Sequence, residues 1–161
     1  MMTPQQLAKS VARAVVTRDG AAMAELFTED GTYHDVFYGE FAGRERIAEL
    51  VNDWIYRAAK NTRWDMFDVV GDGERVYGRY IWSYVSTLPE AGGKRVGFEG
   101  VCMLKLRGGL MSEYREIANT APALLDIGFP AERVAKIMHR QGLAFKARAD
   151  VKEHLAKAAH P

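Results

Sequence analysis

An aspartate lies in the middle of an aromatic, strand-forming stretch, Thr32 to Phe37, which breaks at Gly39. β-Branched and aromatic residues favour strands, whereas aspartate is more typical of turns. Asp35 therefore either caps nearby backbone or faces a cavity in which a buried base is useful. In a cavity, aromatic neighbours would partly desolvate its carboxylate, which would raise its pKa and strengthen it as a base.

The neighbours of Asp35 divide between the two faces of this strand, because successive strand side chains point in opposite directions. Tyr33 shares the face of Asp35, and Phe37 and Trp54 are expected nearby as aromatic partners. His34 should point the other way, so a direct His34–Asp35 pair is not expected. We therefore predict Asp35 and Tyr33 as catalytic residues.

A second acid, Glu116, is predicted on the last strand, where it shares a face with Tyr114. An unpaired buried charge is costly, so Glu116 inside a cavity would need a partner. Arg79 on a neighbouring strand is the expected partner, either in catalysis or in an ion pair that ties the sheet together. The residues predicted to contact a ligand are Phe37, Trp54, Trp64, Glu99, Val101 and Tyr114.

Several other chemistries are not expected. Cys102 is the only cysteine, which excludes an internal disulfide and suits a cytoplasmic protein. His139, His154 and His160 have no metal-ligand spacing, and the glycine pairs lie between strands, so neither a metal nor a phosphate-bearing cofactor is predicted. The chain has 22 basic and 21 acidic residues and no long apolar run, so we expect neither nucleic acid nor a membrane as partner.

The hydrophobic pattern places helices first and strands afterwards. Three helices are expected at about 4–18, 21–27 and 44–59, with a turn at 28–31 before the strand that contains Asp35. From residue 62 the period changes, and strands are expected at 62–70, 75–87, 95–107 and 110–118. This order predicts an α+β fold in which helices pack on one face of a curved antiparallel sheet.

The order of elements resembles the NTF2-like cone fold, and most closely the SnoaL-like polyketide cyclases and the ketosteroid isomerases. The segments that carry the resemblance are Ala24–Gly31, Tyr33–Asp35, Gly43–Ile47 and Tyr114–Glu116. In the order given, they are similar to four features of the family: a helix that ends in acidic residues and glycine, a strand that ends in aspartate, a helix that begins with the pattern GR-E-x-I, and a strand segment with an aromatic residue, an arginine and an acid. The resemblance covers roughly residues 5 to 118 and places Asp35 at the position of the isomerase's general base.

The sequence departs from both enzymes that it resembles. At the isomerase's two oxyanion donors it has Val11 and, approximately, Val101, with Glu99 as the nearest acid on that face. Limonene epoxide hydrolase is also similar, because Arg79 and Glu116 match its arginine and one acid, but Ile81 stands at its other acid. We therefore expect neither a steroid isomerase nor this hydrolase.

The resemblance implies a cofactor-free enzyme, an isomerase or lyase, acting on a small hydrophobic carbonyl compound. Asp35 would remove a proton next to the carbonyl, while Tyr33, Tyr114 or Glu116 with Arg79 would hold the developing oxyanion. Isomerisation, dehydration and aldol-type cyclisation share this step, and the sequence does not choose among them. The alternative is a non-catalytic module that binds an apolar ligand or a protein partner, which would explain the missing oxyanion donors.

Residues 121–161 extend beyond the domain predicted for residues 1–120. After a break at Gly128–Pro130, a helix is expected from Ala131 to about His154, weakened near Gly142. We favour packing of its apolar positions on the same domain or on a partner over a lid across the pocket.

The strands between residues 62 and 118 have apolar side chains on both faces, which is more apolar surface than a single core can bury. Exposed apolar surface of this extent usually marks an interface, so we expect a homodimer. The resemblance to the family also implies that the outer face of the sheet pairs two subunits.

Overall fold

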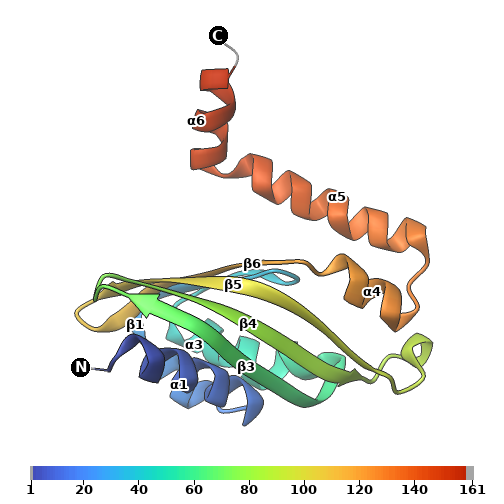
Figure 1. The fold of residues 1–161 in the computed structure, drawn as a ribbon, viewed down its shortest axis with the longest axis horizontal. Helices are drawn as coiled ribbons and strands as arrows, with labels where there is room; N and C mark the ends of the chain where they lie inside the picture. Colours follow the sequence, from blue (N-terminus) through green and yellow to red (C-terminus); the bar gives the residue numbers. More distant parts are fainter. Residues whose placement is uncertain (1, 159–161) are drawn as a thin grey trace.

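The helices at the start of the chain cover one face of the sheet (Figure 1). The structure is a computed structural model that describes residues 2–158. Helix α1 (Pro4–Val16) begins with a capping box, in which Gln6 N donates to Thr3 Oγ1 and Thr3 N donates to Gln6 Oε1. Helices α2 (Gly20–Glu25) and α3 (Arg44–Glu49) follow. A π-helical turn and a 3₁₀ turn extend α3 to Arg57, close to the predicted end of this helix.

Within residues 2–158, six strands form one curved sheet. They are β1 (Phe27–Asp35), β2 (Gly39–Ala42), β3 (Ala59–Gly71), β4 (Arg75–Ser86), β5 (Arg95–Arg107) and β6 (Leu110–Ala118), in the order β2-β1-β6-β5-β4-β3. The four strands predicted after residue 62 are confirmed to within a few residues. Only β1 and β6 pair in parallel, so the sheet is not wholly antiparallel. Residues 28–31, predicted as a turn, belong to β1, and this strand ends at Asp35.

The main core lies between the N-terminal helices and the concave face of the sheet. Val15 on α1, Ile47 on α3 and Leu104 on β5 are among its fully buried side chains. This packing confirms the predicted α+β arrangement.

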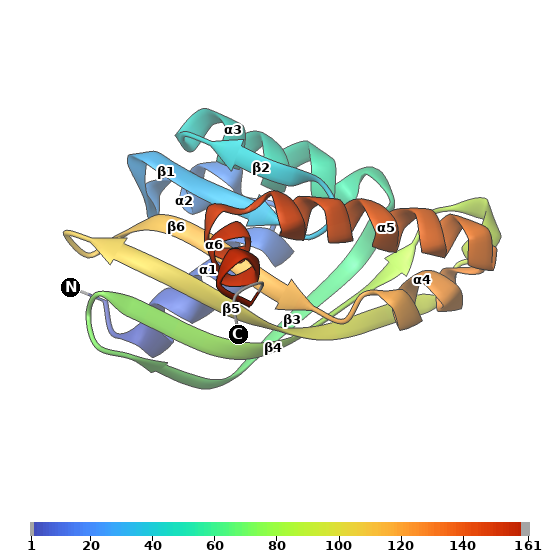
Figure 2. The same ribbon diagram turned by 90° about the horizontal axis from the view of Figure 1, so that it is seen from above.

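Within residues 121–158, the described part of the C-terminal extension, the chain forms three helices, α4 (Ala121–Ile127), α5 (Ala131–Ala147) and α6 (Ala149–Ala158). The single helix predicted after Ala131 is interrupted at Arg148, whose backbone is extended, and not at Gly142. Figure 1 shows α5 on the side of the sheet opposite α1, and Figure 2 shows that it crosses above the strands. Val134 of α5 is buried in a second apolar cluster with residues of α4, and Ile137 and Met138 pack against that cluster.

Candidate active site

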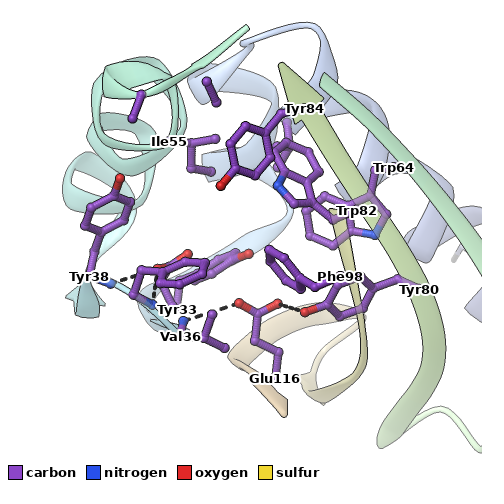
Figure 3. A pocket seen from close by; sticks show the side chains of 15 residues that line it. Tyr33, Val36, Tyr38, Ile55, Trp64, Tyr80, Trp82, Tyr84, Phe98 and Glu116 are labelled. Carbon is purple, nitrogen blue, oxygen red and sulfur yellow. Dashed lines mark hydrogen bonds between the residues drawn. The ribbon is translucent and has the colours of Figure 1, made fainter. Parts of the chain in front are cut away.

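A cavity of about 80 Å³ lies between the concave face of the sheet, α1 and the segment that follows α3 (Figure 3). Its lining combines two carboxyl groups with a wall that is mostly aromatic. The lining residues are Val15, Tyr33, Asp35, Val36, Phe37, Tyr38, Ile55, Ala58, Ala59, Trp64, Tyr80, Trp82, Tyr84, Phe98 and Glu116. None of these residues is a lysine or an arginine, so no cation in the described lining neutralises the carboxyl groups.

Asp35 both caps backbone and faces the cavity. Its Oδ1 accepts hydrogen bonds from the backbone N–H of Phe37 at 2.8 Å and of Tyr38 at 2.9 Å. This turn ends β1, which explains why a strand-like sequence stops at the aspartate. Burial raises the pKa of Asp35, and the two backbone hydrogen bonds only partly oppose this shift. The carboxyl group is therefore a stronger base than an exposed aspartate.

Glu116 on β6 lines the cavity and accepts hydrogen bonds from three donors, of which Tyr80 and Val36 are labelled in Figure 3. Its Oε2 accepts from the hydroxyl groups of Tyr80 at 2.8 Å and Tyr114 at 3.1 Å, and its Oε1 accepts from Val36 N at 3.3 Å. Burial and the negative charge of Asp35 raise the pKa of Glu116 to about 8, although these hydrogen bonds favour its charged form.

The two carboxyl groups therefore form an acid–base pair. Burial raises the pKa of both groups, and the negative charge of Asp35 further raises that of Glu116, to about 8. These shifts favour a protonated Glu116 beside an ionised Asp35 at neutral pH. A carboxylate that accepts a proton and a carboxylic acid that donates one then face the same apolar cavity.

Tyr80 reaches Glu116 because β5 leaves room for its ring. Tyr80 pairs with Gly100 across β4 and β5, and a Cβ on Gly100 would lie 2.6 Å from the Tyr80 hydroxyl. On this strand the sequence pattern indicated Arg79 as a site residue, and its neighbour Tyr80 was not predicted. The glycine opposite a tyrosine was the signal that could have identified Tyr80.

The predicted catalytic Tyr33 and the predicted ligand contact Tyr114 lie in neighbouring strands and stack, with ring centroids 4.1 Å apart. Tyr33 lines the cavity, whereas Tyr114 is fully buried beneath it and contacts the site through Glu116. His34 points away from Asp35, and its Nδ1 lies 3.7 Å from a carboxylate oxygen of Glu40.

The aromatic wall contains two of the predicted ligand contacts, Phe37 and Trp64. Phe37 meets the ring of Phe98 edge to face at 5.7 Å. Trp54 is outside the lining: its ring packs against Tyr38 and Phe41. Trp54 therefore supports the wall from behind and does not face the cavity.

Three predicted site residues lie on the opposite, convex face of the sheet, and their placement in the pocket was wrong. Arg79 forms ion pairs with Asp68 at 3.2 Å and with Glu99 at 3.8 Å, all on the exposed side. Val101 is directly opposite Arg79 in the sheet and is 43% exposed. The physical reason is strand alternation, because Tyr80 points into the cavity and its neighbour Arg79 must point out.

Within residues 2–158, no group of three or more His, Cys, Asp or Glu side chains could hold a metal ion. No helix in the same range is long and apolar enough to cross a membrane.

Similarity to solved structures extends over most of the chain. A protein with a ketosteroid isomerase-like fold from Catenulispora acidiphila, in complex with trimethylamine, has a TM-score of 0.71 and 20% identity over 81% of this chain and 98% of that one. IdmH from Streptomyces antibioticus, a proposed polyketide cyclase, has a TM-score of 0.64 and 19% identity over 80% of this chain and 100% of that one. An LEH-like epoxide hydrolase from M. tuberculosis has a TM-score of 0.60 and 15% identity over 75% of this chain and 86% of that one.

At these identities the structures share a fold with this protein, and the different chemistries in their names show that the fold alone does not define a reaction. No curated protein matches the sequence. The SnoaL-like domain, in contrast, matches residues 8–114, which include α1 from Ala8 onward, the whole of β1 with Asp35, and β6 up to Tyr114. Because that match covers most of the chain and agrees with the cone-shaped fold around the carboxyl pair, this protein belongs to the SnoaL-like domain family.

Proposed function

We propose that this protein is a cofactor-free enzyme that removes a proton next to the carbonyl group of a small hydrophobic compound. The observation that supports this most is the Asp35–Glu116 pair, a base and an acid that share one apolar cavity. Aromatic walls suit a hydrophobic substrate, and a low-dielectric cavity strengthens electrostatic effects on a developing charge.

Each carboxyl group has one role in the proposed reaction. Ionised Asp35 takes a proton from the carbon next to the carbonyl, and protonated Glu116 donates a hydrogen bond to the carbonyl oxygen as it becomes an oxyanion. Return of the proton to a different carbon gives isomerisation. Departure of a β-hydroxyl group, which takes up the proton from Asp35 and leaves as water, gives dehydration. Attack of the enolate carbon on a second carbonyl, whose oxygen then takes up that proton, gives aldol-type closure. Glu116 thus supplies the oxyanion donor that the sequence lacks at the isomerase's own donor positions.

Deuterium exchange tests the step that these reactions share. The protein is incubated in D₂O with a panel of enones, β-hydroxy ketones and simple cyclic ketones, and deuterium next to the carbonyl is measured by NMR. We expect exchange of at least one compound far above the rate of a buffer control, since proton removal precedes every outcome.

A different result would favour the alternative function, a non-catalytic module that binds an apolar ligand. If no compound exchanges, and native mass spectrometry detects an unaltered small molecule that remained bound through purification, the cavity is a binding site and the proposed chemistry is wrong. A bound apolar molecule alone does not decide between the two functions, because an enzyme also binds its substrate.

We also propose that the protein is a homodimer formed through the convex face of the sheet. Ile81 on β4, Val101 on β5 and Ile117 on β6 are exposed there, and Val101 pairs directly with Ile117. Apolar side chains grouped on an open sheet face are typical of an interface. Light scattering at micromolar concentration should give twice the 18.0 kDa mass of the chain, whereas a value of one chain would contradict the proposal.

A further inference from the structure

We propose that Gln141, on the C-terminal extension, is a positioning residue for the Asp35–Glu116 pair. Its side-chain Nε2 donates a hydrogen bond of 3.1 Å to the backbone carbonyl oxygen of Val36. Val36 directly follows Asp35 and lines the cavity. The inference rests on the proposed acid–base role of the pair, but it concerns how this segment is held, which can be measured without a substrate.

The Val36–Phe37 peptide group links Gln141 to Asp35 directly. Gln141 contacts the carbonyl end of this peptide group, while its N–H end, on Phe37, donates to Asp35 Oδ1 at 2.8 Å. Hydrogen bonds in such a chain polarise one another, so a donor at the carbonyl strengthens the N–H as a donor. Gln141 therefore stabilises the negative charge on Asp35 through one peptide group.

The preceding peptide group links the same segment to the second acid. Val36 N donates to Glu116 Oε1 at 3.3 Å. A shift of the segment would therefore alter the hydrogen bonds of both carboxyl groups. Gln141 fixes the segment from the side of the sheet where α5 lies (Figure 2).

Apolar packing adds to this contact. Val134 of α5 is buried in the second apolar cluster, and Phe37 and Tyr84, both in the cavity wall, pack against the same cluster. The extension thus supports the backbone that carries Asp35 as well as part of the aromatic wall. Gln141 lies outside residues 8–114, so this support is not supplied by the matched SnoaL-like domain.

The test replaces the donor while keeping the shape of the side chain. Gln141→Met keeps an unbranched side chain that favours a helix but cannot donate to Val36, and Arg140→Met introduces the same residue one position earlier, where the side chain is exposed. Two properties are measured by NMR in the ligand-free, full-length protein: hydrogen exchange of the Phe37 and Tyr38 amides, and the titration of the Asp35 side-chain carbon.

Loss of one hydrogen bond should speed amide exchange of Phe37 and Tyr38 about fivefold in Gln141→Met and leave it unchanged in Arg140→Met. The pKa of Asp35 should rise in Gln141→Met only, because its carboxylate loses the polarised donor. Unchanged exchange and an unchanged Asp35 titration in a folded Gln141→Met protein would overturn the inference. Neither readout depends on turnover, so this result would be distinct from a failure of the proposed function, which would appear as absent deuterium exchange in the unmodified protein.

Discussion

Asp35→Asn should lower the rate of substrate deuterium exchange by about 10²- to 10⁴-fold, the range over which a positioned base accelerates a reaction. The asparagine amide is not basic, so it cannot remove the proton. Its Oδ1 can still accept from the backbone amides of Phe37 and Tyr38, which hold the turn after β1. The fold should therefore persist, as circular dichroism and the thermal midpoint would show.

Asp72→Asn is the matched control for this prediction. Asp72 also accepts hydrogen bonds from the two backbone amides that lie two and three positions later, at 3.0 and 2.9 Å, but it is exposed and outside the cavity. It should keep the full rate of exchange. If both variants exchange the substrate as fast as the unmodified protein, Asp35 is a turn-forming residue and not the base.

Glu116→Gln should stabilise the protein above pH 8 while it removes the acid from the site. In the folded protein the pKa of Glu116 is raised from 4.5 to about 8. The folded state therefore keeps a proton that the unfolded chain releases, and stability falls as pH rises from about 4.5 to about 8. Above that range the folded protein must hold two buried negative charges, which glutamine avoids.

The expected gain is on the order of a few kcal/mol, or roughly 5 to 10 °C in thermal midpoint at pH 9. The difference between Glu116→Gln and the unmodified protein should shrink toward pH 5, and thermal unfolding at both pH values measures it. Glu113→Gln is the control on the same strand: ion pairs with Lys105 and Arg115 lower the pKa of Glu113, so its loss should give no gain at pH 9. Parallel pH profiles for the unmodified protein and Glu116→Gln would contradict a raised pKa for Glu116.

Much of the fold could be predicted because it depends on local pattern. The hydrophobic pattern and its change of period near residue 62 placed the first helix and four strands within a few residues. The interruption at Arg148 was missed because a change of backbone direction between two helical segments has no marker there such as glycine or proline.

The candidate site was harder to predict because strand alternation does not say which of two apolar faces is inward. Both faces of β4 are largely apolar, so the sequence does not indicate which of them lines the cavity. The prediction placed Arg79 in the cavity, whereas the structure has Tyr80 and Trp82 there. Asp35 and Glu116 were identified individually, but their coupling depends on the parallel pairing of β1 with β6. That pairing joins segments about 80 residues apart and has no local signal.

If the Asp35–Glu116 pair holds one proton at neutral pH, carbon NMR titration of the two side-chain carboxyl groups in the ligand-free protein will detect it. Glu116 should remain protonated at pH 7 and titrate near pH 8, with Asp35 ionised first and at a higher pH than an exposed aspartate. Independent titration of both groups at the ordinary values of exposed carboxyl groups, near pH 4, would show that the two groups do not share a proton.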